Sequence, residues 1–136
     1  MKPFLGAEAV INVGVETVVE SNTPDGKRGV VFEDDGDTGY FYARDYDRAE
    51  LYFVDALHIY DADKIIDAKQ PSELRIIWSS DFMVAALLIN MRPHIIFHFG
   101  ERIGYAQNPF PDADPKSGWI HKPLHSGLQK LFHSSN

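Results

Sequence analysis

The acidic segment "FEDDGDTGYFYA" (residues 32–43) looks more like a chemical site than any other stretch of this sequence. Its carboxylates could bind a metal ion, act as a catalytic acid and base, or cap a hairpin turn. A calcium loop of the EF-hand type needs oxygen ligands at alternating positions, glycine at the sixth and glutamate at the twelfth. Counted from Asp35, Asp37 fits this pattern but Gly39 does not. The spacing argues against a standard calcium loop, while a looser cation site formed by Asp34, Asp35 and Asp37 remains an alternative.

We interpret the segment as the tip of a β-hairpin. Asp and Gly accept the backbone angles of a tight turn, and Asp side chains bond readily to nearby amides. Gly36 and Gly39 are expected to turn the chain, and the acidic side chains are expected to lie in solvent. The alternation of Tyr40, Phe41 and Tyr42 predicts that the phenylalanine packs inward while the two tyrosines show their phenols outward.

Two other carboxylates lie among apolar residues and are better placed for catalysis. Asp55 belongs to the alternating set of a strand-like run, and Asp81 stands between "WSS" and "FMV". A small-molecule or metal-dependent enzyme could use both together with His58 and His98, and all four side chains should then lie within hydrogen-bonding reach. The alternative for both carboxylates is a structural role, because a buried carboxylate must be hydrogen-bonded or paired.

Other catalytic and cofactor-binding signatures are missing from the sequence. There is no cysteine, so thiolate catalysis, disulfides and cysteine-ligated metals are excluded. The sequence has no GxSxG elbow, no P-loop and no GxGxxG motif. His94 and His98 would lie about 13 Å apart on one strand, too far to share a metal ion. We therefore predict no cofactor and no metal site.

Negative charge is concentrated in one part of the chain. The net charge is −7, and residues 33–67 hold eleven acidic and three basic residues, a local charge of −8. Nucleic-acid binding requires clusters of Lys and Arg, which are absent, so the sequence argues against it. An acidic face attracts a cation or a basic protein surface, although it can also serve solubility alone.

Composition predicts a soluble, cytoplasmic single domain covering residues 1–136. Hydrophobic residues make up 44% of the chain and charged residues 24%, as in an ordinary globular protein. No stretch approaches the roughly 20 apolar residues that span a bilayer, and the N-terminus does not resemble a signal peptide. We therefore expect no membrane association.

Hydrophobic periodicity indicates a protein made mostly of strands. A period of two predicts strands in residues 9–19, 30–32, 38–43, 51–60, 74–79 and 94–99. The run "FMVAALLI" (82–89) is apolar on both alternating faces, which predicts a central strand covered on each side. The segments "SNTPDGKRG" and "NMRP" are typical of turns. The composition of residues 107–123 predicts a long surface loop anchored by Trp119.

The pattern of the C-terminal segment predicts that it forms the single helix of the protein. Leu124, Leu128, Leu131 and Phe132 recur at the spacing of one helical face, although Gly127 in their midst disfavours a helix. Short connections between successive strands favour an antiparallel sheet. The predicted fold class is therefore α+β, mainly an antiparallel β-sheet with a short C-terminal helix.

Three motifs carry a resemblance to a known family. At "FEDDGDTGYFYA", "DALHIYD" and "AALLIN" the sequence resembles an uncharacterised bacterial domain-of-unknown-function family, over roughly residues 28–100 and more loosely at Trp119. That family's pattern places Gly after the Asn of the "LIN" turn, where this chain has Met91, which leaves the turn type open. The resemblance implies a bacterial, compact protein and no particular activity.

The function predicted from the sequence is binding to another protein rather than catalysis. Aromatic residues beside charge are typical of interface hot spots. One form would be an immunity-type inhibitor whose acidic face covers a basic toxin surface; the enzyme described above is the alternative. The predicted binding residues are Asp34, Asp35, Asp37, Tyr40, Tyr42, Tyr46, Asp55 and His58, with Phe32, Tyr52 and Tyr60 as further aromatic anchors and Asp45 and Asp47 as further steering charges.

Overall fold

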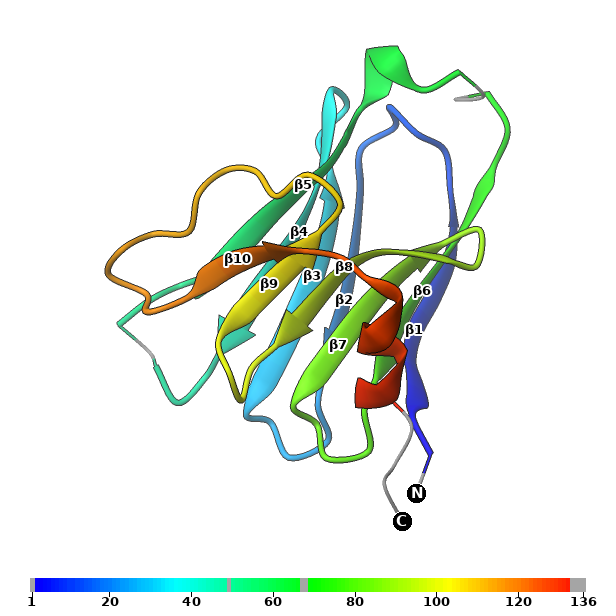
Figure 1. Ribbon diagram of the computed structural model, residues 1–136. Helices are drawn as coiled ribbons and strands as arrows, with labels where there is room; N and C mark the ends of the chain where they lie inside the picture. The colour runs from blue at the N-terminus through cyan, green and yellow to red at the C-terminus, as the bar shows by residue number, and fades with distance from the viewer. Residues whose placement is uncertain (1, 49, 67–68, 133–136) are drawn as a thin grey trace.

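The protein consists of two β-sheets packed face to face (Figure 1). The structure, a computed structural model, describes residues 2–48, 50–66 and 69–132. The first sheet has six strands in the order β1-β6-β7-β8-β9-β10, and the second has four in the order β2-β3-β4-β5. The strands are β1 Phe4–Ile11, β2 Thr17–Asn22, β3 Arg28–Asp34, β4 Thr38–Asp45, β5 Asp55–Asp61, β6 Ser72–Trp78, β7 Val84–Ile89, β8 Arg92–His98, β9 Ile103–Ala106 and β10 Ile120–Pro123.

Neighbouring strands pair antiparallel throughout, except that β10 runs parallel to β9. The main core lies between the sheets, where Phe41 of β4 stacks on Phe97 of β8 with ring centroids 5.2 Å apart. One buried hydrogen bond also joins the sheets, from Trp78 Nε1 on β6 to Ser21 Oγ on β2 at 2.9 Å. Burial of inward-facing side chains from both sheets provides the main stabilising term.

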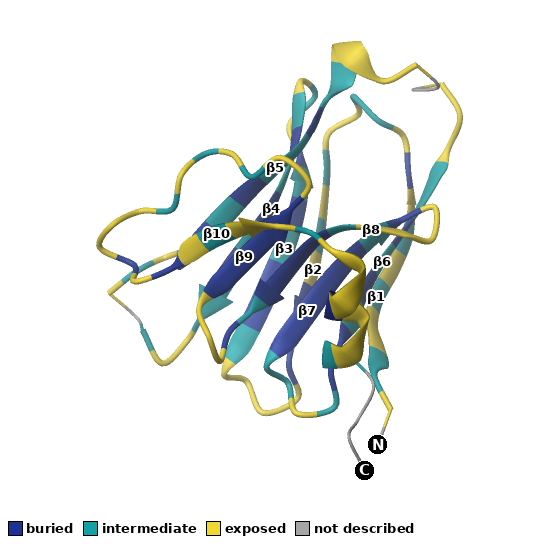
Figure 2. Cartoon of the chain, in the orientation of Figure 1, coloured by how far each residue is buried: buried dark blue, intermediate teal, exposed yellow. Residues whose placement is uncertain are grey.

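Strand β7 is covered on both faces, as its continuous apolar run predicts (Figure 2). Ala85 and Leu87 face the core between the sheets. Val84 and Ala86 face the opposite side, in a second apolar cluster that includes Leu128 of the C-terminal segment. The prediction of a central strand covered on each side is confirmed.

The C-terminal helix is present, but the prediction of its type was wrong. Residues Ser126–Leu131 form a 3-10 helix, η2, and a second 3-10 helix, η1, spans Ala62–Lys64. The apolar face itself is present, because Leu128 is buried and Leu124, Leu131 and Phe132 pack beside it. So short a segment after Pro123, with Gly127 inside it, cannot offset the cost of nucleating an α-helix. The fold is therefore mostly β, and the α+β class fits it only loosely.

The other differences concern where strands begin and end. Residues 9–19 do not form one strand: β1 ends at Ile11, the chain turns through Gly14 at φ +90°, and β2 begins at Thr17 in the other sheet. Strand β5 begins at Asp55 rather than at residue 51. Strand β9 was not predicted, and β10 lies in the predicted surface loop. Among the described residues, no helix is long and apolar enough to cross a membrane.

Candidate functional site

Asp34 is buried in the structure and does not lie in solvent as predicted. Only 1% of its surface is exposed. Its Oδ2 accepts hydrogen bonds from the Gly14 amide and the Tyr60 hydroxyl, both at 2.7 Å, and its Oδ1 accepts one from the Gly36 amide at 2.8 Å. These donors come from the β1–β2 turn, strand β5 and the hairpin tip. The carboxylate therefore joins three segments, and the arrangement gives no support to the cation site considered for Asp34, Asp35 and Asp37.

The β3–β4 connection is a hairpin tip, as predicted, but only one of its two glycines turns the chain. Gly36 has φ +100°, a region that favours glycine, whereas Gly39 lies within β4 with no positive φ. A Cβ on Gly39 would lie 2.6 Å from Cζ of Tyr60, so this position needs glycine for close packing. Asp35 is exposed and accepts hydrogen bonds from the amides of Asp37 and Thr38, which lower its pKa.

An aromatic band lies on the outer face of the four-stranded sheet. Phe41 is buried, while Tyr40 and Tyr42 on the same strand point outward and are half-buried, which confirms the predicted alternation. Tyr42 stacks on Phe53 with ring centroids 4.5 Å apart, and Tyr40 meets His58 edge to face at 5.4 Å. The members of the aromatic band are Tyr40, Tyr42, Tyr52, Phe53, His58 and Phe110.

The sequence-predicted anchors divide between this face and the core. Phe32 and Tyr60 are buried between the sheets, so the structure does not place them where they could contact a partner. Tyr46 and Tyr52 are exposed at 38% and 70%. Burial, followed by the negative charge of Glu33, raises the pKa of Tyr42 to about 12. Four of the six expected aromatic anchors thus reach the outer surface.

Arg44 extends the band at the end of β4. Its guanidinium carbon lies 4.7 Å from the ring centroid of Tyr46 and 4.4 Å from that of Tyr52, within cation–π range. The Tyr46 hydroxyl donates a hydrogen bond to Asn22 Oδ1 at 2.8 Å, which fixes that ring. Tyr52 in turn packs edge to face on Phe53 at 4.7 Å.

His58 connects the band to the acidic end of the sheet. Its Nε2 lies 2.9 Å from Asp61 Oδ1, and this bond lowers the pKa of Asp61. The backbone amide of His58 donates to the carbonyl of Phe110 at 2.7 Å, which attaches the 107–119 loop to β5. Three exposed acidic residues, Asp35 and Asp37 of the β3–β4 turn and Asp63 of η1, form what we call the acidic tip. The Ala62 amide donates to the Asp37 carbonyl at 2.8 Å, which joins the two segments.

Asp55 does not belong to the band. It faces inward, 6% exposed, and both of its carboxylate oxygens lie within 2.9 Å of His121 Nε2 on β10. Burial raises the pKa of Asp55, and the bond to His121 offsets that effect in part. His121 was not predicted to be its partner, because the two residues are 66 positions apart and no local pattern connects them.

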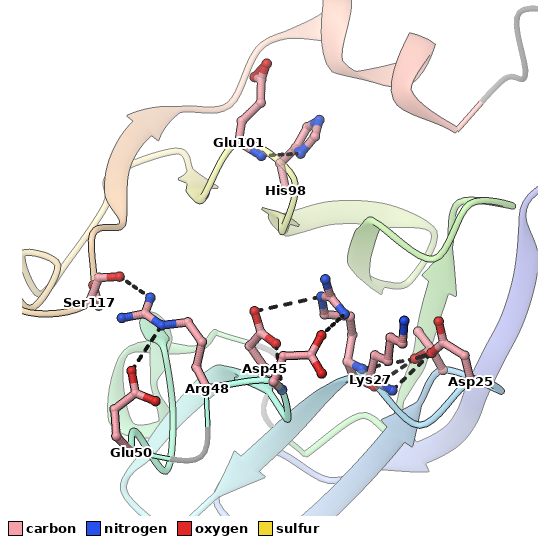
Figure 3. Close-up of polar contacts among 11 residues, drawn as sticks. Asp25, Lys27, Asp45, Arg48, Glu50, His98, Glu101 and Ser117 are labelled. Carbon is pink, nitrogen blue, oxygen red and sulfur yellow. Dashed lines mark hydrogen bonds and ion pairs between the residues drawn. The ribbon is translucent and has the colours of Figure 1, made fainter.

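The four residues of the enzyme alternative do not form one cluster, although Asp81 and His98 lie within electrostatic range of each other. Asp55 pairs with His121, and His58 pairs with Asp61. Asp81 accepts hydrogen bonds from Ser79 Oγ and the Met83 amide in the β6–β7 turn. His98 Nδ1 accepts one from the Glu101 amide (Figure 3). Across the described parts of the chain, no group of three or more His, Asp or Glu side chains could hold a metal ion.

Comparison with known sequences identifies the family of this chain. A family model described as an uncharacterized protein conserved in bacteria (DUF2251) matches residues 11–133. The chain belongs to this family. It is 41% identical over 95 residues to an uncharacterized protein of Haemophilus influenzae. That match covers 70% of this chain but 59% of the relative, so the chain spans about three fifths of the curated relative's length. No solved structure matches the chain. The resemblance to an uncharacterised bacterial family is confirmed.

Proposed function

We propose that this chain is a protein-binding domain that contacts its partner through the aromatic band and the acidic tip. The observation that carries this proposal is the exposure of large aromatic side chains in the loops that flank the outer face of the four-stranded sheet, with Tyr52 exposed at 70% and Phe110 at 59%. On the opposite side of the molecule, η2 packs over the outer face of the six-stranded sheet. Exposed aromatic clusters are what protein interfaces use as anchors.

The aromatic band is preorganised for binding. Each ring is held by its neighbours, with Tyr40, Tyr42 and Phe53 stacked in succession at centroid distances of 5.9 and 4.5 Å. Side chains that are already fixed lose little rotamer freedom when a partner binds, so more of the contact energy appears as affinity. This argument supports recognition of a folded surface by a rigid face.

Charge supports a partner with a basic surface. Asp35, Asp37 and Asp63 are exposed beside the band, and the whole chain carries a net charge of −7. Opposite charges across an interface accelerate association and set orientation more than they add affinity. An inhibitor that covers the basic surface of a toxin is one form of this function.

The proposal is tested by comparing what immobilised variants capture from a lysate of the organism that encodes the chain. Tyr52→Ala with Phe110→Ala changes two exposed members of the band, and recovery of a specific partner should fall at least roughly tenfold. Leu5→Ala with Val10→Ala is the matched control, because these apolar side chains are exposed at 51% and 72% on β1 of the other sheet. Identical sets of captured proteins for both variants and the wild type would contradict the proposal.

A further inference from the structure

Arg44 differs from the other arginines of the described residues that lie near β4. Arg28 pairs with Asp45 and Asp47, and Arg48 pairs with Glu50 and donates to the Ser117 carbonyl (Figure 3). In contrast, no carboxylate in the described part of the chain forms an ion pair with Arg44, and its guanidinium donates no hydrogen bond there. Its N–H donors are therefore available to a ligand.

The guanidinium of Arg44 is nevertheless held in place. The rings of Tyr46 and Tyr52 lie 4.7 and 4.4 Å from it, and each ring has a further contact, Tyr46 a hydrogen bond to Asn22 and Tyr52 the edge of Phe53. A guanidinium presents its donors in a rigid planar fork that matches the two oxygens of a carboxylate. Because the two rings restrict its motion, little side-chain entropy remains to be lost when an anion binds.

A hollow of about 130 Å³ adjoins this guanidinium, lined by Arg44, Asp45, Tyr46, Leu51 and Tyr52. This volume suits a single small group, not a whole metabolite. Asp45 is the one negative charge in the lining, and its carboxylate is paired with Arg28 at 3.9 Å. The five lining residues are therefore one arginine without an ion pair among the described residues, two tyrosines, one leucine, and one aspartate whose carboxylate already has a partner.

We propose that Arg44 binds a carboxylate of the partner protein, and that this contact fixes the direction in which the partner lies along β4. The inference rests on the proposed function. Strand β4 runs from Thr38 at the acidic tip to Arg44, about 20 Å at the rise of an extended chain. A partner segment along it therefore places cationic groups at the tip, apolar groups over Tyr40 and Tyr42, and a carboxylate at Arg44.

The carboxylate site is tested without the partner, by NMR titration of the full chain labelled with nitrogen-15. Sodium acetate is added at constant ionic strength while the Nε–Hε signals of the arginines are followed. Arg44 should shift saturably, at least about threefold more than Arg92 and Arg102, which are exposed and serve as internal controls. Tyr52→Leu should weaken the response of Arg44, because one of the two restricting rings is lost.

Two outcomes of this titration would overturn the inference. One is a shift of Arg44 no larger than those of Arg92 and Arg102. The other is tighter binding of methanesulfonate, a tetrahedral anion of the same charge, than of acetate at equal ionic strength, which would assign the site to a tetrahedral anion and not to a carboxylate.

Arg44→Gln distinguishes this inference from the proposed function. If both hold, the variant should bind the captured partner roughly tenfold more weakly, as truncation of one member of an interfacial charge pair does. If Tyr52→Ala with Phe110→Ala abolishes capture while Arg44→Gln leaves it unchanged, the protein-binding function stands and the carboxylate contact is refuted.

Discussion

At the scale of single residues, Asp34 shows how one carboxylate can hold a loop region together. Its three hydrogen bonds, to Gly14, Gly36 and Tyr60, are made in a position that is 1% exposed. In Asp34→Asn an amide group replaces one oxygen, and at least one backbone donor then faces another donor. A buried unsatisfied polar group costs about 1–3 kcal/mol, so we expect the free energy of unfolding to fall by about 2 kcal/mol in urea titrations.

Asp37→Asn is the matched control, because this residue is exposed in the same hairpin tip. Among the described contacts, the Asp37 carboxylate makes no hydrogen bond or ion pair, and a surface change of this kind stays within about 0.5 kcal/mol. Equal effects of the two substitutions would show that Asp34 does not stabilise the protein through its buried bonds.

The burial of Asp34 could have been predicted from the sequence. Val30, Phe32 and Asp34 occupy alternate positions of β3 and face the same way, so a strand extended by two residues places the carboxylate inward. The prediction ended that strand at Phe32 and assigned all the following acids to the turn. The partner of Asp55 could not be found in this way, since nothing in the sequence shows that β10 lies beside β9 with His121 over Gly104.

At the scale of elements, the β7–β8 turn has a residue unsuited to its backbone. Asn90 has φ +52° and Met91 has φ +67°, the left-handed pair expected of a type I′ hairpin turn. Asn tolerates this conformation, whereas a long side chain such as that of Met91 adopts it at a cost of order 1–3 kcal/mol. The turn thus has the left-handed backbone that favours glycine, although Met91 occupies its second position.

Met91→Gly should stabilise the protein. The relief of backbone strain exceeds the entropy that glycine adds to the unfolded chain, and the exposed Met91 side chain, 58% accessible, buries little surface. We expect a gain of about 1 kcal/mol in the free energy of unfolding, measured by urea titration. Met91→Ala keeps the strain and should give no comparable gain; a loss of stability in Met91→Gly would contradict the argument.

The strands were predicted correctly where a periodic segment forms a single strand of one sheet. The prediction failed where the chain passes from one sheet to the other within such a segment. Strands β6, β7 and β8 follow from their apolar patterns, and the turns at Gly26 and Asn90 from their residues. A period of two, however, continues unchanged through residues 9–19, although β1 and β2 belong to different sheets. The periodicity of side chains records which face is buried, not which sheet the strand joins.

At the scale of the whole molecule, a contact between residues far apart in the sequence joins the two sheets along one side. Asp55 on β5 and His121 on β10 belong to different sheets, and their side chains are exposed at only 1% and 8%. Gly104 on β9 leaves room for this pair, because a Cβ there would overlap Asp55 Oδ2. The pair thus fixes the last strand, and the 107–119 loop before it, against the four-stranded sheet.

His121→Leu should destabilise the protein, and the loss should depend on pH. The substitution leaves a buried carboxylate without a partner, which costs about 3–5 kcal/mol near neutral pH. Burial already raises the pKa of Asp55 above its ordinary value of 3.8, and removal of His121 takes away the bond that lowers it. The folded variant therefore binds a proton at a pH where the unfolded chain has lost it, so its free energy of unfolding falls as pH rises through this range.

Urea titrations of the wild type and of His121→Leu between pH 4 and 8 measure this dependence. The deficit of the variant should be largest above the raised pKa of Asp55 and should shrink as pH falls towards about 4, because the buried carboxyl of the folded variant then takes up a proton and loses its charge. Adding Asp55→Leu removes the buried charge and should recover much of the stability at neutral pH, because a buried ion pair can be replaced by apolar side chains at little cost. A deficit that is constant over this pH range, or a double variant no more stable than His121→Leu, would mean that the carboxylate of Asp55 is not what the histidine neutralises.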